Sequence, residues 1–288
     1  MKKYVIVAES GSDISKELAE RYGIFIVPMH VTFGSETKDD GTFPVTDISE
    51  YYDKTGSIPK TSGCNSEDFI KIFDKIFAMY PDCHIVYMAY SAVTTCSYQS
   101  AMVAAENYDN ILLIDTKNVT IGQCAITIRL AQQIEENPEW TIEEVEEAAY
   151  KIINSLRMCF IPYNLDYLRA GGRVSNATAL CGNILNIHPK IELIDGYLKA
   201  TKKYRGKMDK VVPHLITDFV SDDLERNEIW MGCTHGFSEE LKEDIISACH
   251  VIGFETVNWL YAGGVITTHG GPNAFVIAGF VNESREQR

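Results

Sequence analysis

Short apolar runs alternate with helical patterns through the first half of this sequence, and that alternation constrains the fold more than any other feature. Runs at 4–8, 25–33, 85–90 and 111–114 have the length and continuity of strands that are buried on both faces. Stretches with helical spacing lie between them, at 14–22, 47–55, 67–79, 96–107 and 118–136. Because strands that alternate with helices form βαβ units, we predict a mostly parallel sheet in an α/β/α layered domain.

The second half has a different pattern. Segments near 190–194 and 197–202 read as strands and flank Asp195-Gly196, a dipeptide that strongly favours a two-residue hairpin. Further strands are expected near 158–163, 228–233, 255–260, 265–268 and 274–280, with helices at 142–155, 207–220 and 239–250. A hairpin beside helices predicts a mixed sheet. At 288 residues we therefore expect two α/β domains, 1–156 and 157–288.

Several helix starts carry recognisable signals. Thr141 and Glu144 have the spacing of a capping box, in which each side chain binds the other's backbone N–H. Thr46, Ser66 and Ser238 suit N-cap positions. These residues predict where the helices begin.

The chain is acidic, with 40 Asp and Glu against 26 Lys and Arg and a formal charge of −14. This balance argues against non-specific binding to nucleic acid or anionic membranes. No apolar run approaches the roughly 18 residues of a membrane span, and the run after the N-terminal lysines is too short for a signal peptide. The eight cysteines have no zinc-type spacing. We expect a cytoplasmic protein with reduced, structural thiols and no metal site.

Two hydroxyl-rich stretches lie at or next to predicted helix starts. Pro59-Lys60-Thr61-Ser62 precedes the helix that opens near Ser66, and the run 85–90 leads into Ser91-Ala92-Val93-Thr94-Thr95-Cys96-Ser97. Free backbone N–H groups and the helix dipole favour an anion at such places. If the two turns converge, they form a site for one small negative group.

Other polar residues are weaker candidates. His269 lies between two threonines and two glycines, at what reads as a strand end, which favours a ligand contact as much as a structural role. Arg173 follows two glycines and is expected to pair with a carboxylate; Arg205 belongs to a mildly basic segment that reads as surface. The sequence has no G-x-x-x-x-G-K-[ST], G-x-G-x-x-G, H-E-x-x-H or G-x-S-x-G motif. It therefore indicates no nucleotide cofactor and no common hydrolase.

An ordered set of short segments identifies a resemblance that spans nearly the whole chain. The segments are Ser10-Gly11-Ser12-Asp13, Lys60-Thr61-Ser62, Tyr98-Gln99-Ser100-Ala101, Asp115-Thr116, Ala170-Gly171-Gly172-Arg173-Val174 and Thr268-His269-Gly270-Gly271-Pro272. Each is weak alone, but the order is specific. The sequence resembles the DegV family of bacterial lipid-binding proteins, which includes the fatty-acid-binding subunit of fatty acid kinase.

The resemblance implies a long-chain fatty acid buried between or inside two domains. It assigns the carboxylate to Thr61 and Thr95, with Ser62 beside them, and completes the head-group region with His269 and Arg205. Ser91 and Gly270 would belong to the head-group loops. On this reading the protein is a non-catalytic carrier without cofactor or stable membrane insertion. Its expected partner is the catalytic subunit of a fatty acid kinase.

The chain departs from the family pattern at both main motifs. Gly63-Cys64 stands where Gln-Pro is usual, and Thr94-Thr95-Cys96 replaces Leu-Ser-Gly. Threonine keeps the hydroxyl but stiffens χ1, and Cys96 removes the backbone freedom of a glycine. We expect a reshaped pocket that keeps its hydrogen-bond donors.

Two other functions fit the same residues. One is a hydrolase or acyltransferase that uses Thr95 or Ser97 with His269, with Asp115 as the acid that would orient the imidazole. The other is a sensor that binds lipid and regulates a protein partner. The sensor needs the same pocket as the carrier.

Overall fold

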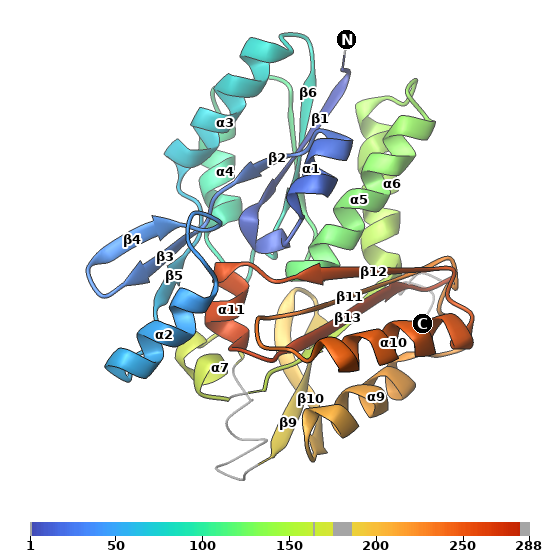
Figure 1. Ribbon diagram of the computed structural model, residues 1–288. Helices are drawn as coiled ribbons and strands as arrows, with labels where there is room; N and C mark the ends of the chain where they lie inside the picture. Colours follow the sequence, from blue (N-terminus) through green and yellow to red (C-terminus); the bar gives the residue numbers. More distant parts are fainter. Residues whose placement is uncertain (1, 164, 175–185, 283–288) are drawn as a thin grey trace.

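The computed structural model of the protein is a layered α/β structure (Figure 1). The structure describes residues 2–163, 165–174 and 186–282. The strands are β1 (Tyr4–Glu9), β2 (Phe25–Val27), β3 (His30–Phe33), β4 (Glu36–Asp39), β5 (Lys60–Ser62), β6 (His84–Ala89), β7 (Ile111–Asp115), β8 (Leu156–Ile161), β9 (Ile187–Ile194), β10 (Tyr197–Arg205), β11 (Glu228–Cys233), β12 (Thr256–Tyr261) and β13 (Phe275–Phe280). The helices are η1 (Ser10–Ser12), α1 (Lys16–Tyr22), α2 (Thr46–Thr55), α3 (Ser66–Met79), α4 (Ser97–Ala105), α5 (Thr120–Glu136), α6 (Ile142–Ser155), α7 (Leu165–Gly171), α9 (Met208–Phe219), α10 (Glu239–Ile252) and α11 (Gly264–Gly270).

The first sheet is parallel throughout, in the order β2-β1-β6-β7. Through Val5 and Val7, one face of β1 belongs to the core that includes α3 and α4. Through Ile6, the other face belongs to the core that includes α5 and α6. Because both faces are covered, these strands need apolar residues at every position, which explains their continuous runs in the sequence.

Helix α5 lies between the parallel sheet and a second, six-stranded sheet. Most of its residues from Thr120 to Ala131 are buried. They share one hydrophobic core with Met88 of the first sheet and with Val276 and Phe280 of the second. A helix that is buried on nearly all sides belongs between two layers. Figure 1 shows α5 above the second sheet and beside the first.

The six-stranded sheet is mixed, in the order β10-β9-β8-β13-β11-β12, with only β11 and β12 parallel among its described pairs. Helices α9 and α10 pack on its far face. A small antiparallel sheet, β4-β3-β5, carries Thr61 on β5. The predicted fold class, a parallel sheet followed by a mixed sheet, is confirmed. The division at residue 156 stays a prediction, although β8 begins there.

The predicted hairpin and two predicted helix N-caps, whose partners lie close together in the sequence, are confirmed. Asp195 and Gly196 both have positive φ, 51° and 80°, and join β9 to β10 as a hairpin. The Thr141–Glu144 capping box is present at α6, and Ser238 accepts a hydrogen bond from the backbone N–H of Leu241. Each of these devices is complete within a few residues of chain.

Other local predictions are wrong in detail. The expected strand 25–33 breaks after Val27, where Pro28 supplies no N–H for a ladder. The N-cap of α3 is Asn65, whose side chain accepts from the N–H groups of Glu67 and Asp68, so Ser66 is the first helical residue. Helix α2 likewise begins at Thr46 itself.

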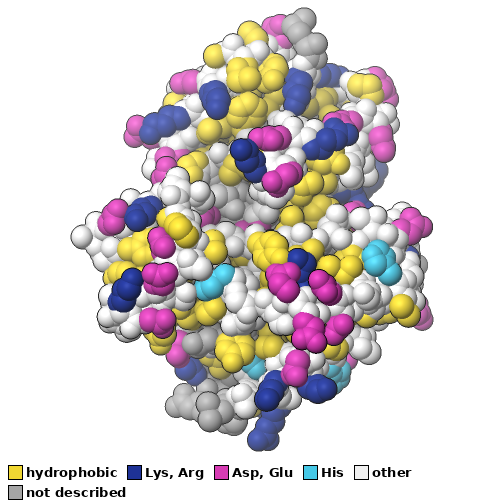
Figure 2. Space-filling view, viewed as in Figure 1, with side chains coloured by type: hydrophobic (Ala, Val, Ile, Leu, Met, Phe, Trp, Pro, Cys, Tyr) yellow, Lys and Arg dark blue, Asp and Glu magenta, His cyan; other side chains and the backbone are white. Residues whose placement is uncertain are grey.

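The surface mixes the two signs of charge. On the face shown in Figure 2, acidic and basic side chains are interspersed among apolar ones. No helix within the described residues is long and apolar enough to cross a membrane. The seven cysteines among those residues are free thiols, and Cys181 lies outside them.

Candidate ligand-binding site

A cavity lies between the carboxyl ends of the parallel strands and one face of the mixed sheet. Its empty space, with the opening to solvent included, is about 920 Å³. The parallel sheet contributes the chain after β6, β5 contributes the segment after Lys60, and the mixed sheet contributes residues of β8, β10, β11 and β13. Its lining residues include Thr61, Ser62, Gly63, Tyr90, Thr94, Thr95, Thr120, Phe160, Leu168, Arg173, Val174, Leu198, Thr234, Val265, His269, Gly270, Phe275 and Val276.

Three of the threonines in the lining use their hydroxyls in hydrogen bonds within the protein. Thr94 donates to the carbonyl of Ser91 at 2.8 Å, and Thr120 donates to Asp13. Thr234 donates to the carbonyl of Gly271 and accepts from the N–H of Ala274. These side chains therefore offer the cavity mainly their methyl groups, which adds to the apolar surface of Phe160 and Leu198.

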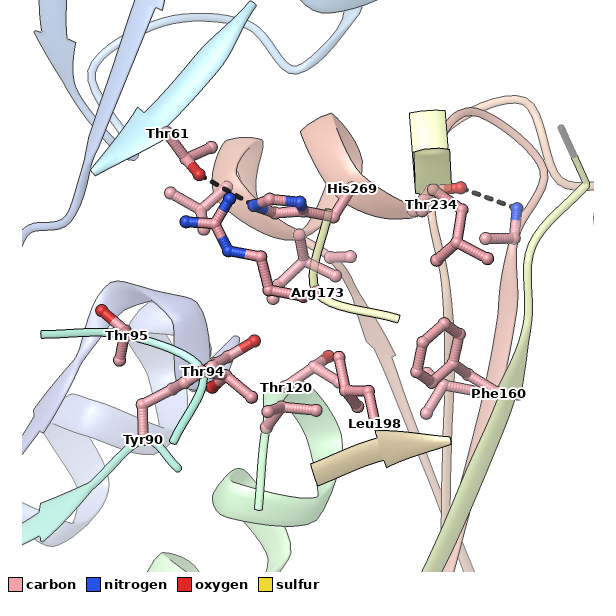
Figure 3. A pocket seen from close by; sticks show the side chains of 18 of the residues that line it. Thr61, Tyr90, Thr94, Thr95, Thr120, Phe160, Arg173, Leu198, Thr234 and His269 are labelled. Carbon is pink, nitrogen blue, oxygen red and sulfur yellow. Dashed lines mark hydrogen bonds between the residues drawn. The ribbon is translucent and has the colours of Figure 1, made fainter. Parts of the chain in front are cut away.

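The polar side chains that can donate hydrogen bonds to a ligand lie at one end of the cavity. Figure 3 shows Thr61, Arg173 and His269 together on one side of the cavity, with Thr95 opposite them and Phe160 and Leu198 away from them. A cavity with polar groups at one end and apolar walls beyond suits an amphipathic molecule.

Thr61 and His269 are directly joined. Oγ1 of Thr61 lies 2.8 Å from Nε2 of His269. Burial, with a smaller contribution from the positive charge of Arg173, lowers the pKa of His269 to about 4. The imidazole is therefore neutral at pH 7. Its other nitrogen lies against Gly171, where a Cβ would overlap Nδ1, so position 171 must lack a side chain for this ring position.

Arg173 is the cation of this site. Nη1 donates to the carbonyl of Gly171 at 2.6 Å, and the guanidinium lies beside Thr61 and His269 (Figure 3), while residue 173 as a whole is exposed. Sequence reasoning assigned Arg173 only a pairing role. The sequence feature that could have indicated its role is its position after Gly171 and Gly172. Gly172 takes a positive φ of 66° at the turn that leads to the cavity.

Most of the residues expected at the head group line the cavity: Thr61, Ser62, Thr95, His269 and Gly270. Arg205 does not. Its neighbour Tyr204 is buried and donates to Asp218, so strand alternation directs Arg205 to the exposed side of β10. Ser91 is also outside the lining; its hydroxyl donates to the carbonyl of Gly196 and joins the β6 loop to the hairpin tip.

Thr61 and Ser62 precede a helix as predicted, but they lie on a strand rather than in a turn. Both lie on strand β5, where Thr61 pairs with Val31, and α3 begins only at Ser66. Likewise the predicted strand 265–268 is helix α11. Its first N–H groups are accepted by two buried carboxylates from distant segments. Asp13 binds the N–H of Gly263 at 2.7 Å, and Asp40 binds the N–H of Gly264 at 2.8 Å.

The arrangement also bears on the hydrolase alternative. His269 contacts Thr61 rather than Thr95 or Ser97. Asp115 accepts from the backbone N–H groups of Ala92 and Lys117, which occupies it in the β7 turn. Among the described residues, no acid is recorded as a hydrogen-bond partner of His269, so a Ser-His-Asp type relay is not assembled.

The carboxyl of Asp13, which helps to hold α11, leads to a pH prediction. Burial first, and repulsion from Asp40 second, raise the pKa of Asp13 from 3.8 to about 7 against the effect of its hydrogen bonds. The folded state therefore holds this proton more tightly than the unfolded chain does. Its contribution to stability is present below pH 4 and is lost as the pH rises toward 7, by up to roughly 4 kcal/mol.

We expect Asp13→Asn to remove that part of the pH dependence. Asparagine still accepts the N–H of Gly263 and tolerates the φ of 54° at this position. Urea unfolding at several pH values between 4.5 and 8 measures the effect, with the exposed Asp82→Asn as the control. Parallel losses of stability in wild type and Asp13→Asn would contradict the expectation.

The chain is similar to known proteins in both sequence and fold. The family model of the DegV family, described as uncharacterised proteins, matches residues 3–281. A DegV domain-containing protein of Caldanaerobacter subterraneus subsp. tengcongensis is 29% identical over 282 residues, which cover 95% of this chain and 97% of that protein.

Two Thermotoga maritima matches carry a description of a ligand. A protein named fatty acid-binding protein is 28% identical over 278 residues, covering 94% of this chain and 95% of its own. The crystal structure of a DegV lipid binding protein superposes with a TM-score of 0.82 at 26% identity, covering 98% of this chain and all of that one (100%).

Proposed function

The chain belongs to the DegV family, and we propose that it binds a long-chain fatty acid. The acyl chain occupies the cavity, and the carboxylate lies between Thr61, Thr95 and Arg173. The named ligands of two Thermotoga maritima relatives support this ligand class. The single observation that carries the proposal is the division of the cavity into one polar end and apolar walls.

The polar end suits an anion. The Thr61 and Thr95 hydroxyls and the Arg173 guanidinium can all donate hydrogen bonds, and a carboxylate only accepts them. Neutral His269 can support Thr61 by donating from Nε2 to its oxygen, which leaves the Thr61 proton for the ligand. A carboxylate buried without such donors would be unstable.

The apolar walls supply most of the affinity. Burying about 14 methylene groups at about 0.8 kcal/mol each contributes on the order of 11 kcal/mol before costs. A charge-assisted hydrogen bond contributes only about 1.5–3 kcal/mol, and association itself costs at least several kcal/mol. The acyl chain therefore provides binding strength, whereas the head-group residues provide orientation and select the acid.

We propose that the protein acts as a carrier that presents the carboxylate to the catalytic subunit of a fatty acid kinase. The absence of nucleotide-binding motifs from the sequence supports a partner that supplies ATP. The exposure of Arg173, which lines the cavity, supports a head group that a partner can reach from solvent. In this role the threonine hydroxyls are ligands rather than nucleophiles.

Mass spectrometry of the purified protein tests the ligand. The protein is denatured, and its organic extract is compared with that of an equal amount of buffer carried through the same column. We expect close to one fatty acid per chain. An extract that stays empty after incubation with a panel of fatty acids would refute the proposal.

The carrier role needs a second measurement. Loaded protein alone should leave both ATP and acyl esters unchanged, and acyl phosphate should form only after a kinase catalytic subunit is added. Consumption of ATP or ester by the protein alone would favour an enzyme instead.

A further inference from the structure

Ser97 lies directly behind Thr95, outside the lining of the cavity. Its side chain is fully buried at the start of α4. Its oxygen accepts a hydrogen bond from the backbone N–H of Cys64 at 3.1 Å and lies 3.1 Å from Oγ1 of Thr95. Ser97 thus connects the chain after β5 to the residue that faces the proposed head group.

Either hydroxyl of the Ser97–Thr95 pair can donate, and an anion bound in the cavity selects one direction. A hydroxyl has one proton and two lone pairs. The Cys64 N–H already uses a lone pair of Ser97, and the recorded acceptor for the Ser97 proton, among the described residues, is Thr95. The Ser97 backbone N–H also points to Oγ1 of Thr95, at 3.4 Å. When Thr95 donates its proton to an anion in the cavity, its oxygen accepts the proton of Ser97.

Position 63 makes this arrangement possible. A Cβ on Gly63 would overlap Oγ1 of Thr95 and would lie 2.6 Å from Oγ of Ser97. Two hydroxyls therefore occupy the space that any side chain at position 63 would take. Position 64 matters for a different reason, since a proline there would have no N–H to donate to Ser97.

We infer that Ser97 is a positioning residue: held by the Cys64 N–H and admitted by Gly63, it makes Thr95 a hydrogen-bond donor toward the ligand. A head group that only accepts hydrogen bonds, such as a carboxylate, satisfies this donor. A fatty alcohol of equal length offers a single oxygen and no charge. The site therefore discriminates between head groups through Ser97. This inference rests on the proposed function and adds a specificity role to it.

The test compares two ligands of equal chain length, a fatty acid and the corresponding fatty alcohol, on each variant. We expect Ser97→Ala to lower the acid-to-alcohol affinity ratio about 5- to 10-fold, because Thr95 then loses the hydroxyl that donates to its oxygen and holds its side chain toward the ligand. Ser97→Thr keeps the hydroxyl and should retain most of the ratio. Ser100→Ala, on the same helix and without a recorded side-chain hydrogen bond, is the matched control and should equal wild type.

The outcomes separate this inference from the proposed function. A purely structural role for Ser97 would weaken both ligands equally, and an unchanged ratio in Ser97→Ala would overturn the inference while acid binding stands. Gly63→Ala gives a second test, since it displaces both hydroxyls without removing either and should also lower the ratio. If wild type binds neither ligand, the proposed function fails and the inference fails with it.

Discussion

Leu198→Asp should weaken fatty acid binding by at least 100-fold. Leu198 lies on β10, lines the cavity and packs against Leu168 and Val174. An aspartate there would place a charge beside the acyl chain. With the chain bound, the carboxylate would lose its water; with the carboxylate hydrated, the acyl chain would lose its apolar contact. Since the apolar walls supply most of the affinity, a loss of about 2.7 kcal/mol or more follows, which corresponds to a factor of 100.

Tyr197→Asp is the matched control. Tyr197 is the adjacent residue on the same strand, points to the opposite face and is 53% exposed. We expect it to bind fatty acid as wild type does. Titration calorimetry measures affinity, and thermal unfolding shows whether each variant is folded. A folded Leu198→Asp variant with wild-type affinity would mean that the acyl chain lies elsewhere.

Arg173→Met should weaken fatty acid binding about 10-fold and leave binding of the matching alcohol nearly unchanged. Methionine keeps much of the apolar stem and removes the guanidinium. A charge-assisted hydrogen bond contributes about 1.5–3 kcal/mol, but the exposed position of Arg173 reduces the gain toward the lower figure. Loss of about 1.4 kcal/mol corresponds to the factor of ten.

Arg205→Met is the control. It tests whether the head-group arginine is Arg205, as the resemblance implies, or Arg173, as the structure indicates. Arg205 is exposed on β10 and outside the lining of the cavity, so its removal should leave affinity unchanged. The same titrations with acid and alcohol compare the two variants. A larger loss in Arg205→Met than in Arg173→Met would restore the assignment made from the resemblance.

Features that could be predicted from the sequence depend on neighbouring residues. The parallel sheet follows from continuous apolar runs such as 85–90, because a strand covered on both faces needs apolar side chains at successive positions. The hairpin at Asp195-Gly196 and the capping box at Thr141 are complete within four residues. For these elements the local chain contains both partners of each interaction.

Helix α11 shows why other elements could not be predicted. Its apolar residues Val265 and Ile266 form a run too short to distinguish a helix from a strand. Its first N–H groups are accepted by Asp13 and Asp40, which precede it by more than 200 residues. The helix start therefore depends on chain that is remote in sequence, and His269 depends on the helix.

The sequence by itself determined the fold class and the alternation of strands and helices around the parallel sheet, and through the family resemblance it identified Thr61, Thr95 and His269 of the cavity lining. Only the tertiary structure decided that Arg173 rather than Arg205 lines the cavity, and that Ser97 and Gly63 set the Thr95 hydroxyl. The reason is physical. Periodic burial is encoded in adjacent residues, whereas the direction of a side chain and the partner of a hydroxyl depend on segments that meet only after folding.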